Sequence, residues 1–429
     1  MIRRIVFIFL FFVSLTAFSQ RASSSPYSVF GIGEEFNVKT VEQVSMGGIG
    51  VAYSSASYLN FINPAANANL KFSTYSFGML NNTLTFKDAS NKQSSTSTSL
   101  SYFAFGAPIG QKAGFSVGMQ PISSVGYSLK NQVTDANGDV TEISFFSGKG
   151  GVNRVYGSFG VLITKGLSFG IEADFAFGKI KNSIINQRKN VSLATKYEES
   201  ATVRGGSIKI GIQYKKVLKN YLYLDFGTVI KLSNRLKVKG TSKTYTLTFT
   251  NSGGELPRDI SPITPLSGNF KLPIQTILGA GIGKANKWYT GFEYEYQNAL
   301  DVTGYLAVSG VAFRYGKSNR ISFGGFYLPK INSISSYFQR ISYRAGLRFE
   351  KTGLLVNGTS TSGNFTAIND FGISFGLGLP LGNRLSNVNL GFEFGKKGIT
   401  KNNLIQENYF NFRLSLSLND IWFIKRQID

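Results

Sequence analysis

Hydrophobic and polar residues alternate strictly along most of this chain. In residues 167–178, LSFGIEADFAFG, the odd-numbered positions are apolar or aromatic throughout. The even-numbered positions, the other parity, carry Glu172, Asp174, serine, alanine and glycine. Successive side chains of a β-strand point to opposite faces of the sheet, so a period of two predicts a strand with one apolar and one polar face. The same pattern recurs in residues 288–297, 341–350, 387–395 and 410–419. The chain is therefore expected to be all-β.

Alternation of this kind occurs both in water-soluble β-proteins and in membrane barrels. Here the apolar parity is rich in aromatic residues near the strand ends, while the polar parity carries charges of both signs in mid-strand. Charges on one face suit a wet lumen, and apolar residues on the other face suit lipid. The composition agrees, with 37 Phe, 21 Tyr and 48 Gly. These features predict a transmembrane antiparallel β-barrel.

The strand number follows from the length. After a leader and an opening segment, about 360 residues remain, and roughly 25 residues per strand and turn give about 14 strands. The long polar stretches are expected to be extracellular loops; they are Lys87–Thr98, Gln187–Ala201, Asn251–Asn269 and Asn357–Asn364. The third of them contains three of the ten prolines, and we expect it to lie outside the hydrogen-bonded wall.

The extreme N-terminus has the order of a secretory signal peptide. Arg3 and Arg4 precede an almost entirely apolar run, Ile5–Leu15, and small residues follow at Ala17 and Ser19. The run is too short for a membrane anchor, which needs roughly 20 apolar residues. We expect residues 1–19 to be cleaved and the mature protein to reside in the cell outer membrane.

The chain is strongly basic, with 46 Lys and Arg against 23 Asp and Glu, a formal net charge of +23. In an exported barrel such an excess suits anionic headgroups better than nucleic acid, and no nucleic-acid partner is expected. The expected partners are outer-membrane lipid and lipopolysaccharide.

Residues 20–70 do not alternate, unlike residues 71–429, which we assign to the barrel. Gly47, Gly48 and Gly50 lie among many small residues, which allow close backbone packing in a confined space. The proline of Asn63-Pro64-Ala65 makes a rigid turn, which the asparagine side chain is suited to cap. We expect residues 20–70 to form a hatch inside the lumen and Asn63-Pro64-Ala65 to be its hinge.

Seven charged residues on the polar parity are expected to line the lumen: Glu172, Asp174, Glu293, Glu295, Arg344, Arg348 and Arg413. Four residues of the other parity are expected to face lipid: Phe169, Phe292, Leu347 and Leu414. On this assignment Leu414→Arg is expected to be costly and Ser415→Arg mild.

No chemistry is assigned to these residues. The carboxylate pairs Glu172/Asp174 and Glu293/Glu295 arise equally from polar lumen lining, and the chain contains neither histidine nor cysteine. Residues 279–285, GAGIGKA, fall one residue short of a phosphate-binding loop and lie in a strand–turn–strand context. We expect no catalytic site, no cofactor and no metal site, and no enzymatic activity.

Several segments resemble the FadL-type outer-membrane transporters of hydrophobic compounds. Residues 46–52, MGGIGVA, followed by Asn63-Pro64-Ala65-Ala66, are similar to the N-terminal hatch of that family, and residues 147–180 are similar to its middle region. The opening SPYSVFGIGE and the closing SLNDIWFIKR resemble the version found in Bacteroidetes-type bacteria. The resemblance implies a fourteen-stranded barrel, a hatch that blocks the lumen, and a hydrophobic small-molecule ligand.

Three hypotheses for the function stay open. The first is uptake or passage of hydrophobic or amphipathic small molecules across the outer membrane. The second is a non-transporting accessory barrel, such as a plug or shuttle partner of the type IX protein secretion translocon. The third is a structural or adhesive surface barrel. The sequence does not identify the solute or the partner.

Overall fold

The computed structural model describes residues 25–36, 38–89, 91–304, 313–359, 363–382 and 386–421, so the expected signal peptide lies outside the described residues. The helices in these ranges are short: η1 (Pro26–Val29), α2 (Val41–Val44), η2 (Pro64–Asn69), η3 (Lys219–Tyr221) and η5 (Phe338–Arg340). None of the described helices is long and apolar enough to cross a membrane.

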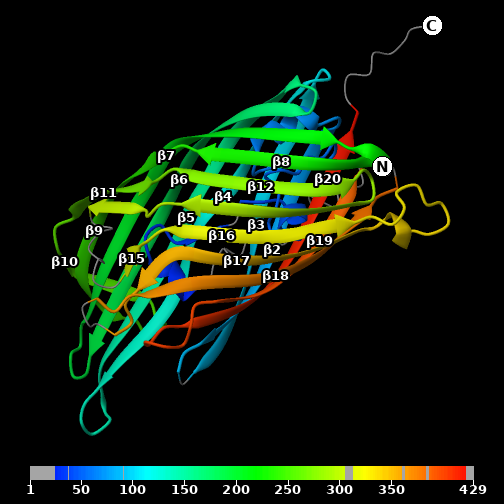
Figure 1. The fold of residues 1–429 in the computed structure, drawn as a ribbon. Helices are drawn as coiled ribbons and strands as arrows, with labels where there is room; N and C mark the ends of the chain where they lie inside the picture. Colours follow the sequence, from blue (N-terminus) through cyan, green and yellow to red (C-terminus); the bar gives the residue numbers. More distant parts are fainter. Residues whose placement is uncertain are drawn as a thin grey trace.

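Ten continuous strands and four interrupted ones form a closed antiparallel wall of fourteen strands (Figure 1). The continuous strands are β2 (Ser73–Lys87), β3 (Lys92–Ile109), β4 (Ala113–Thr134), β5 (Val140–Thr164), β6 (Leu167–Arg188), β7 (Ala194–Val217), β17 (Ser342–Val356), β18 (Thr366–Pro380), β19 (Asn387–Lys397) and β20 (Gln406–Asp420). Pairing of β2 with β20, from Ser73↔Asp420 to Lys87↔Gln406, closes the barrel. The predicted fold class is confirmed.

Each interrupted strand consists of two consecutive elements. They are β8 (Leu222–Lys231) with β9 (Asn234–Phe249), β11 (Thr264–Leu272) with β12 (Gln275–Lys284), β13 (Trp288–Gln297) with β14 (Asp301–Gly304), and β15 (Phe313–Tyr315) with β16 (Ser318–Tyr327). The breaks lie side by side, because Leu272 pairs with Asn234 and Gln275 pairs with both Lys231 and Gln297. Pro273, which has no N–H to donate, lies in one of them.

The expectation that Asn251–Asn269 would stay outside the wall is wrong. This stretch contains β10 (Glu255–Ile260) and the first part of β11, in which Pro257 pairs with Leu247 and Pro265 with Thr241. Both prolines occupy positions that tolerate a missing N–H. The register of β10 shifts directly after Pro257, and at Pro265 β11 has β9 on one side but lies beyond its pairing with β14.

The wall divides into two regions. We name residues 123–152, 176–205 and 234–272 the extension; they belong to β4–β7 and β9–β11 and end in the long hairpins at the left of Figure 1. The band comprises the wall segments on the other side of the strand breaks. Within β6, Phe175 in the band points outward and is exposed while Glu172 points inward and is buried; in the extension, Lys179 is exposed and Ile180 is buried. Odd positions of this strand face outward in both regions, but the apolar residues lie on the outer face in the band and on the inner face in the extension.

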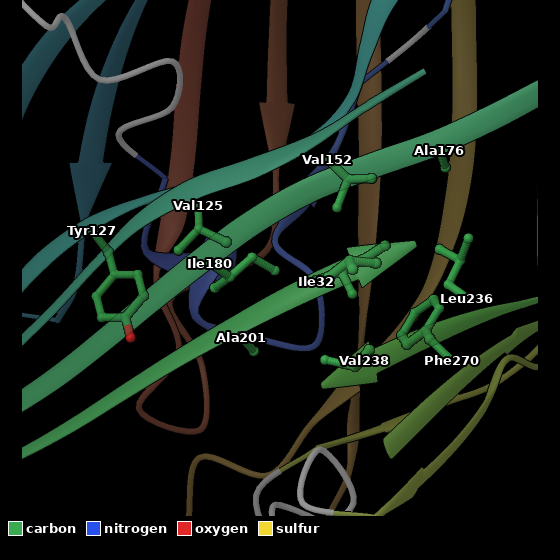
Figure 2. Close-up of a cluster of buried hydrophobic side chains, with 11 residues drawn as sticks. Ile32, Val125, Tyr127, Val152, Ala176, Ile180, Ala201, Leu236, Val238 and Phe270 are labelled. Carbon is green, nitrogen blue, oxygen red and sulfur yellow. The ribbon is translucent and has the colours of Figure 1, made fainter. Parts of the chain in front are cut away.

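The inward apolar residues of the extension form the largest buried cluster in the described structure (Figure 2). Its members are Ile32, Val125, Tyr127, Val152, Ala176, Ile180, Ala201, Val203, Leu236, Val238 and Phe270. Ile32 comes from the N-terminal segment, and the other residues come from the wall. The extension thus has a dry core like that of a soluble β-barrel, built around a residue supplied by the inner segment.

Residues 25–36 and 38–70 lie inside the barrel, shown in blue in Figure 1. η2 contacts β3–β7, α2 contacts β18–β20, and the two-residue strand β1 (Glu34–Glu35) pairs with β4. The segment therefore contacts opposite sides of the wall and fills the lumen.

Candidate functional site

Glycines on the inner face of the wall make room for the inner segment. A Cβ atom added to Gly211 would come within 2.0 Å of Asn63 Oδ1, and one added to Gly346 would come within 2.1 Å of the Gly47 nitrogen. Twelve wall glycines face the segment in this way: Gly106, Gly114, Gly160, Gly170, Gly211, Gly227, Gly279, Gly291, Gly324, Gly346, Gly376 and Gly391. We name this set the glycine girdle.

The girdle is nearly continuous across the strands. Gly114, Gly160, Gly170 and Gly211 are successive cross-strand partners on β4–β7, and Gly291, Gly324 and Gly346 continue the row on β13, β16 and β17. Because a missing side chain lets another backbone approach closely, the girdle fixes the level at which the inner segment sits. Gly279 of the GAGIGKA stretch belongs to it and packs against Val51.

Asn63, Pro64 and Ala65 lie at the start of η2, fully buried against the wall. The Asn63 carboxamide oxygen accepts from the Ala65 N–H at 3.0 Å, and its NH2 group donates to the Val51 and Ile212 carbonyls. The cap therefore joins two parts of the segment to β7. Whether this turn acts as a hinge stays a prediction.

Gly47, Gly48 and Gly50 form a tight turn after α2. Gly47 and Gly48 have positive φ angles of 70° and 86°, which glycine adopts without strain. The Gly47 N–H donates to Ser374 Oγ at 2.9 Å, and the Gly50 N–H donates to the Glu293 carboxylate at 2.8 Å. These glycines thus attach the segment to β18 and β13.

Glu293 is the main polar anchor of the segment. One carboxylate oxygen accepts from the N–H groups of Gly50 and Val51, each at 2.8 Å, and the other lies 3.1 Å from Lys39 Nζ. Burial lowers the pKa of Lys39 to about 8, even though the nearby Glu293 carboxylate opposes that shift. The ion pair between segment and wall is therefore held in a strongly desolvating environment.

The other predicted lumen residues are held in ion-pair networks. Arg154 Nη1 lies 2.8 Å from Glu172 and 3.3 Å from Asp174, and Lys209 Nζ lies 2.8 Å from Glu172. The networks on the far side of the lumen are Arg320–Glu295, Arg320–Glu350, Arg348 with Glu350, Asp370 and Glu393, and Arg413–Glu393. Arg344 instead donates to Asn389 Oδ1 at 3.0 Å. Each carboxylate of the two pairs considered for catalysis has a cationic partner.

The residues expected to face lipid have the opposite environment. Phe292, Leu347 and Leu414 are exposed on the outer surface, and Phe169 is partly exposed. The sequence reading did not include Lys39, Arg154 and Lys209, which supply much of the positive charge inside. Arg154 and Lys209 share the inward parity of their strands, so the alternation contained the signal for them.

A cavity of about 330 Å³ lies between the inner segment and the wall. Its lining combines an apolar set with a charged set: Ile32, Leu236, Phe270, Leu272, Leu300 and Tyr315 in the first, and Lys39, Arg154, Lys231, Arg320, Glu35 and Glu350 in the second. Leu232 and Pro273 also line it, so the cavity reaches the wall at the strand breaks.

Lys231 is a cation of this cavity that no carboxylate contacts directly among the described residues, although Asp174, Glu172 and Glu35 attract it at longer range. Among the described residues it has neither a hydrogen bond nor an ion pair, and its side chain is partly exposed. The cavity can therefore receive a molecule with an apolar body and an anionic group.

The sequence model of the BamG family matches residues 1–429 of the chain. No curated protein matches it at a significant level.

Solved outer-membrane channels share the fold. The chain is 15% identical to the CymD monoaromatic hydrocarbon channel, with 91% of this chain and 99% of that one covered and a TM-score of 0.55. It is 15% identical to the Pseudomonas putida toluene transporter TodX, with 92% of this chain and 100% of that one covered and a TM-score of 0.56. It is 10% identical to a Pseudomonas aeruginosa FadL homologue, with 91% of this chain and 99% of that one covered and a TM-score of 0.57. At such low identity the likeness shows a FadL-like barrel and nothing finer.

Proposed function

This chain belongs to the BamG family, and from its FadL-like barrel and its cavity we propose that it passes hydrophobic or amphipathic small molecules across the outer membrane. The observation that carries the proposal is the cavity between the inner segment and the wall. Part of its lining is apolar, Lys231 lines it without a direct ion pair among the described residues, and it lies at four adjacent strand breaks. The solved channels with this fold carry hydrocarbons, which supports a hydrophobic cargo.

Binding of two matched probes tests the cavity. Octanoate and octanol share an apolar chain and differ in the charge of the head. We expect both to bind the purified barrel, and we expect Lys231→Met to weaken octanoate about tenfold while leaving octanol unchanged. Lys216→Met is the control, because Lys216 is exposed near the short turn between β7 and β8. Failure of the wild-type protein to bind either probe would refute the proposal.

Gating is tested separately by conductance in planar bilayers. Deleting Pro26–Ala66 is expected to turn a closed barrel into a leaky one, since that stretch fills the lumen. Glu293→Leu provides a milder variant that keeps the segment but removes its carboxylate anchor, and we expect it to show intermittent openings. Unchanged conductance in both variants would mean that the segment does not gate the barrel.

A second candidate is a non-transporting accessory barrel. The girdle and the Glu293 anchor hold the segment on several sides, which suits a permanently closed barrel as well as a gated one. Under this alternative neither probe enters the cavity. Its more specific forms, a role beside the type IX translocon and a Bacteroidetes-type origin, stay predictions.

A further inference from the structure

The outer surface of the extension carries a dense set of basic side chains that the proposed transport does not use. Its members are Lys149, Lys179, Lys181, Arg204, Arg235, Lys237, Lys239 and Lys271, all of them exposed. No hydrogen bond or ion pair is found for any of the eight among the described residues. We name this set the basic belt.

The belt faces outward because the residues that alternate with it along the strands are buried in the apolar core of the extension. Ile180, Leu236 and Val238 lie between belt residues in sequence and pack inward in the buried cluster (Figure 2). Since successive strand residues point to opposite faces, Lys179, Arg204 and Lys237 must point away from the barrel. Turning them inward would bury charges in a dry core.

The belt begins where the lipid-facing surface ends. Phe175 on β6, Ile208 on β7 and Leu232 after β8 are the last exposed apolar residues before Lys179, Arg204 and Arg235. The basic side chains are therefore continuous with the apolar surface of the band. This is the level at which the headgroups of a surrounding leaflet would lie.

Cross-strand register places like charges directly opposite each other. Lys149 pairs with Lys181, Arg204 with Lys237, and Arg235 with Lys271. Like charges opposite each other in an antiparallel pair are destabilising, and strands lie about 4.8 Å apart. A bound phosphate group between two such side chains would relieve the repulsion. Asp301, opposite Lys271, is an acidic neighbour in register with one member of the belt.

From this arrangement we propose that the basic belt binds the phosphate groups of a phosphorylated glycolipid in the outer leaflet. The charge is complementary, and the belt adjoins the lipid-facing surface. It spans β5, β6, β7, β9 and β11, so a headgroup with more than one phosphate can contact several cations at once. The proposal depends on the outer-membrane setting and not on transport.

Binding to the folded barrel in detergent tests it with three probes: bisphosphorylated lipid A, its dephosphorylated form, and inorganic phosphate. The belt variant combines Lys179→Gln, Arg204→Gln and Lys237→Gln. The control combines Lys165→Gln, Lys216→Gln and Lys219→Gln, which remove the same charge from exposed positions near the short turns. Heat-modifiable mobility on gels checks that every variant is folded, and Arg204→Gln alone serves as a milder change.

We expect the wild-type protein and the control to bind lipid A at least about tenfold more tightly than its dephosphorylated form. The belt variant should lose most of that difference, and added salt should reduce it in the wild-type protein. Equal affinity of the wild-type protein for both lipids would overturn the proposal, as would competition by inorganic phosphate at equal concentration. Full lipid A binding by the belt variant would also overturn it, because the phosphate groups would then bind elsewhere on the barrel.

Discussion

The band and the extension are built from the same strands but have opposite faces. In the band, Ile171 and Phe175 are 44% and 49% exposed on the outer surface, while Glu172 is buried against cations inside. A few residues along the same strand, Ile180 lies in a dry core and Lys179 faces outward. The difference shows that alternation defines two faces, whereas the surroundings of each region decide which face is apolar.

The inner segment follows the same division. Where it crosses the band it uses glycine, small residues and polar groups such as Lys39, which meets Glu293. Where it reaches the extension it contributes Ile32 to the apolar cluster. A segment of this kind is held by close backbone contact and hydrogen bonds at one level and by hydrophobic packing at the other.

The largest effect is expected for a charge placed inside the extension. Val203 is 0% exposed, so Val203→Glu should destabilise the barrel by roughly 5 kcal/mol. Thr202→Glu, one residue away, should be neutral or slightly stabilising, because Lys179 and Lys239 lie opposite Thr202. Urea unfolding of the refolded barrel measures both. A tolerated Val203→Glu would show that the extension has no dry core.

A charge on the outer face of the band should have the next largest effect. Leu414 is 38% exposed, and Leu414→Arg should cost about 2–4 kcal/mol if this position lies near the bilayer midplane. Thr85→Arg is the control, because Thr85 lies in the polar part of β2 and forms an exposed cross-strand hydrogen bond with Ser94. Equal costs in lipid vesicles would place Leu414 outside the membrane.

The surroundings of Ser415 argue against a mild effect of Ser415→Arg, which stays a prediction. Ser415 is buried inside and lies 3.3 Å from the Asn389 carboxamide, which in turn donates to Glu42 of the inner segment. We expect an arginine at this position to displace the inner segment. An inward side chain that packs against the inner segment does not have the room that a side chain in a water-filled lumen would have.

A smaller effect is expected where a methyl group is added to the girdle. Gly211→Ala would bring Cβ within 2.0 Å of Asn63 Oδ1 and should cost about 1–3 kcal/mol through overpacking. Gly157→Ala is the matched control, since nothing lies within 4 Å of an added Cβ there. Thermal unfolding distinguishes the two. A neutral Gly211→Ala would mean that the segment is not seated against β7.

The smallest effect is expected from pH. The pKa of Lys39 is about 8 in the seated segment against an ordinary 10.5, so the displaced state binds more protons between these values. Raising the pH through this window should therefore favour the seated state, by no more than about tenfold per pH unit. Opening frequency in planar bilayers should fall, and Lys39→Met should abolish the dependence. More frequent openings at high pH would contradict the assignment.

The sequence by itself determined the strands, their two faces and the non-alternating opening segment. These are local properties: the period of two is set by strand geometry, and small residues without alternation cannot build a two-faced wall. The strand number followed from length alone. The same local pattern placed Glu172, Asp174, Glu293 and Arg348 on the polar face, where each has an ionic partner inside.

Only the tertiary structure decided which residues meet and where the two regions divide. Glu293 lies more than two hundred residues from the Gly50 and Val51 N–H groups that it accepts from, and no local pattern carries that pairing. In the sequence the girdle glycines occupy the polar face of their strands like many other small residues, and only the structure shows that they contact the inner segment. The sequence does show the apolar residues of β6 moving from odd positions, such as Phe175, to even ones, such as Ile180. Only the structure shows that odd positions still face outward there and that an apolar core, not lipid, covers the even ones.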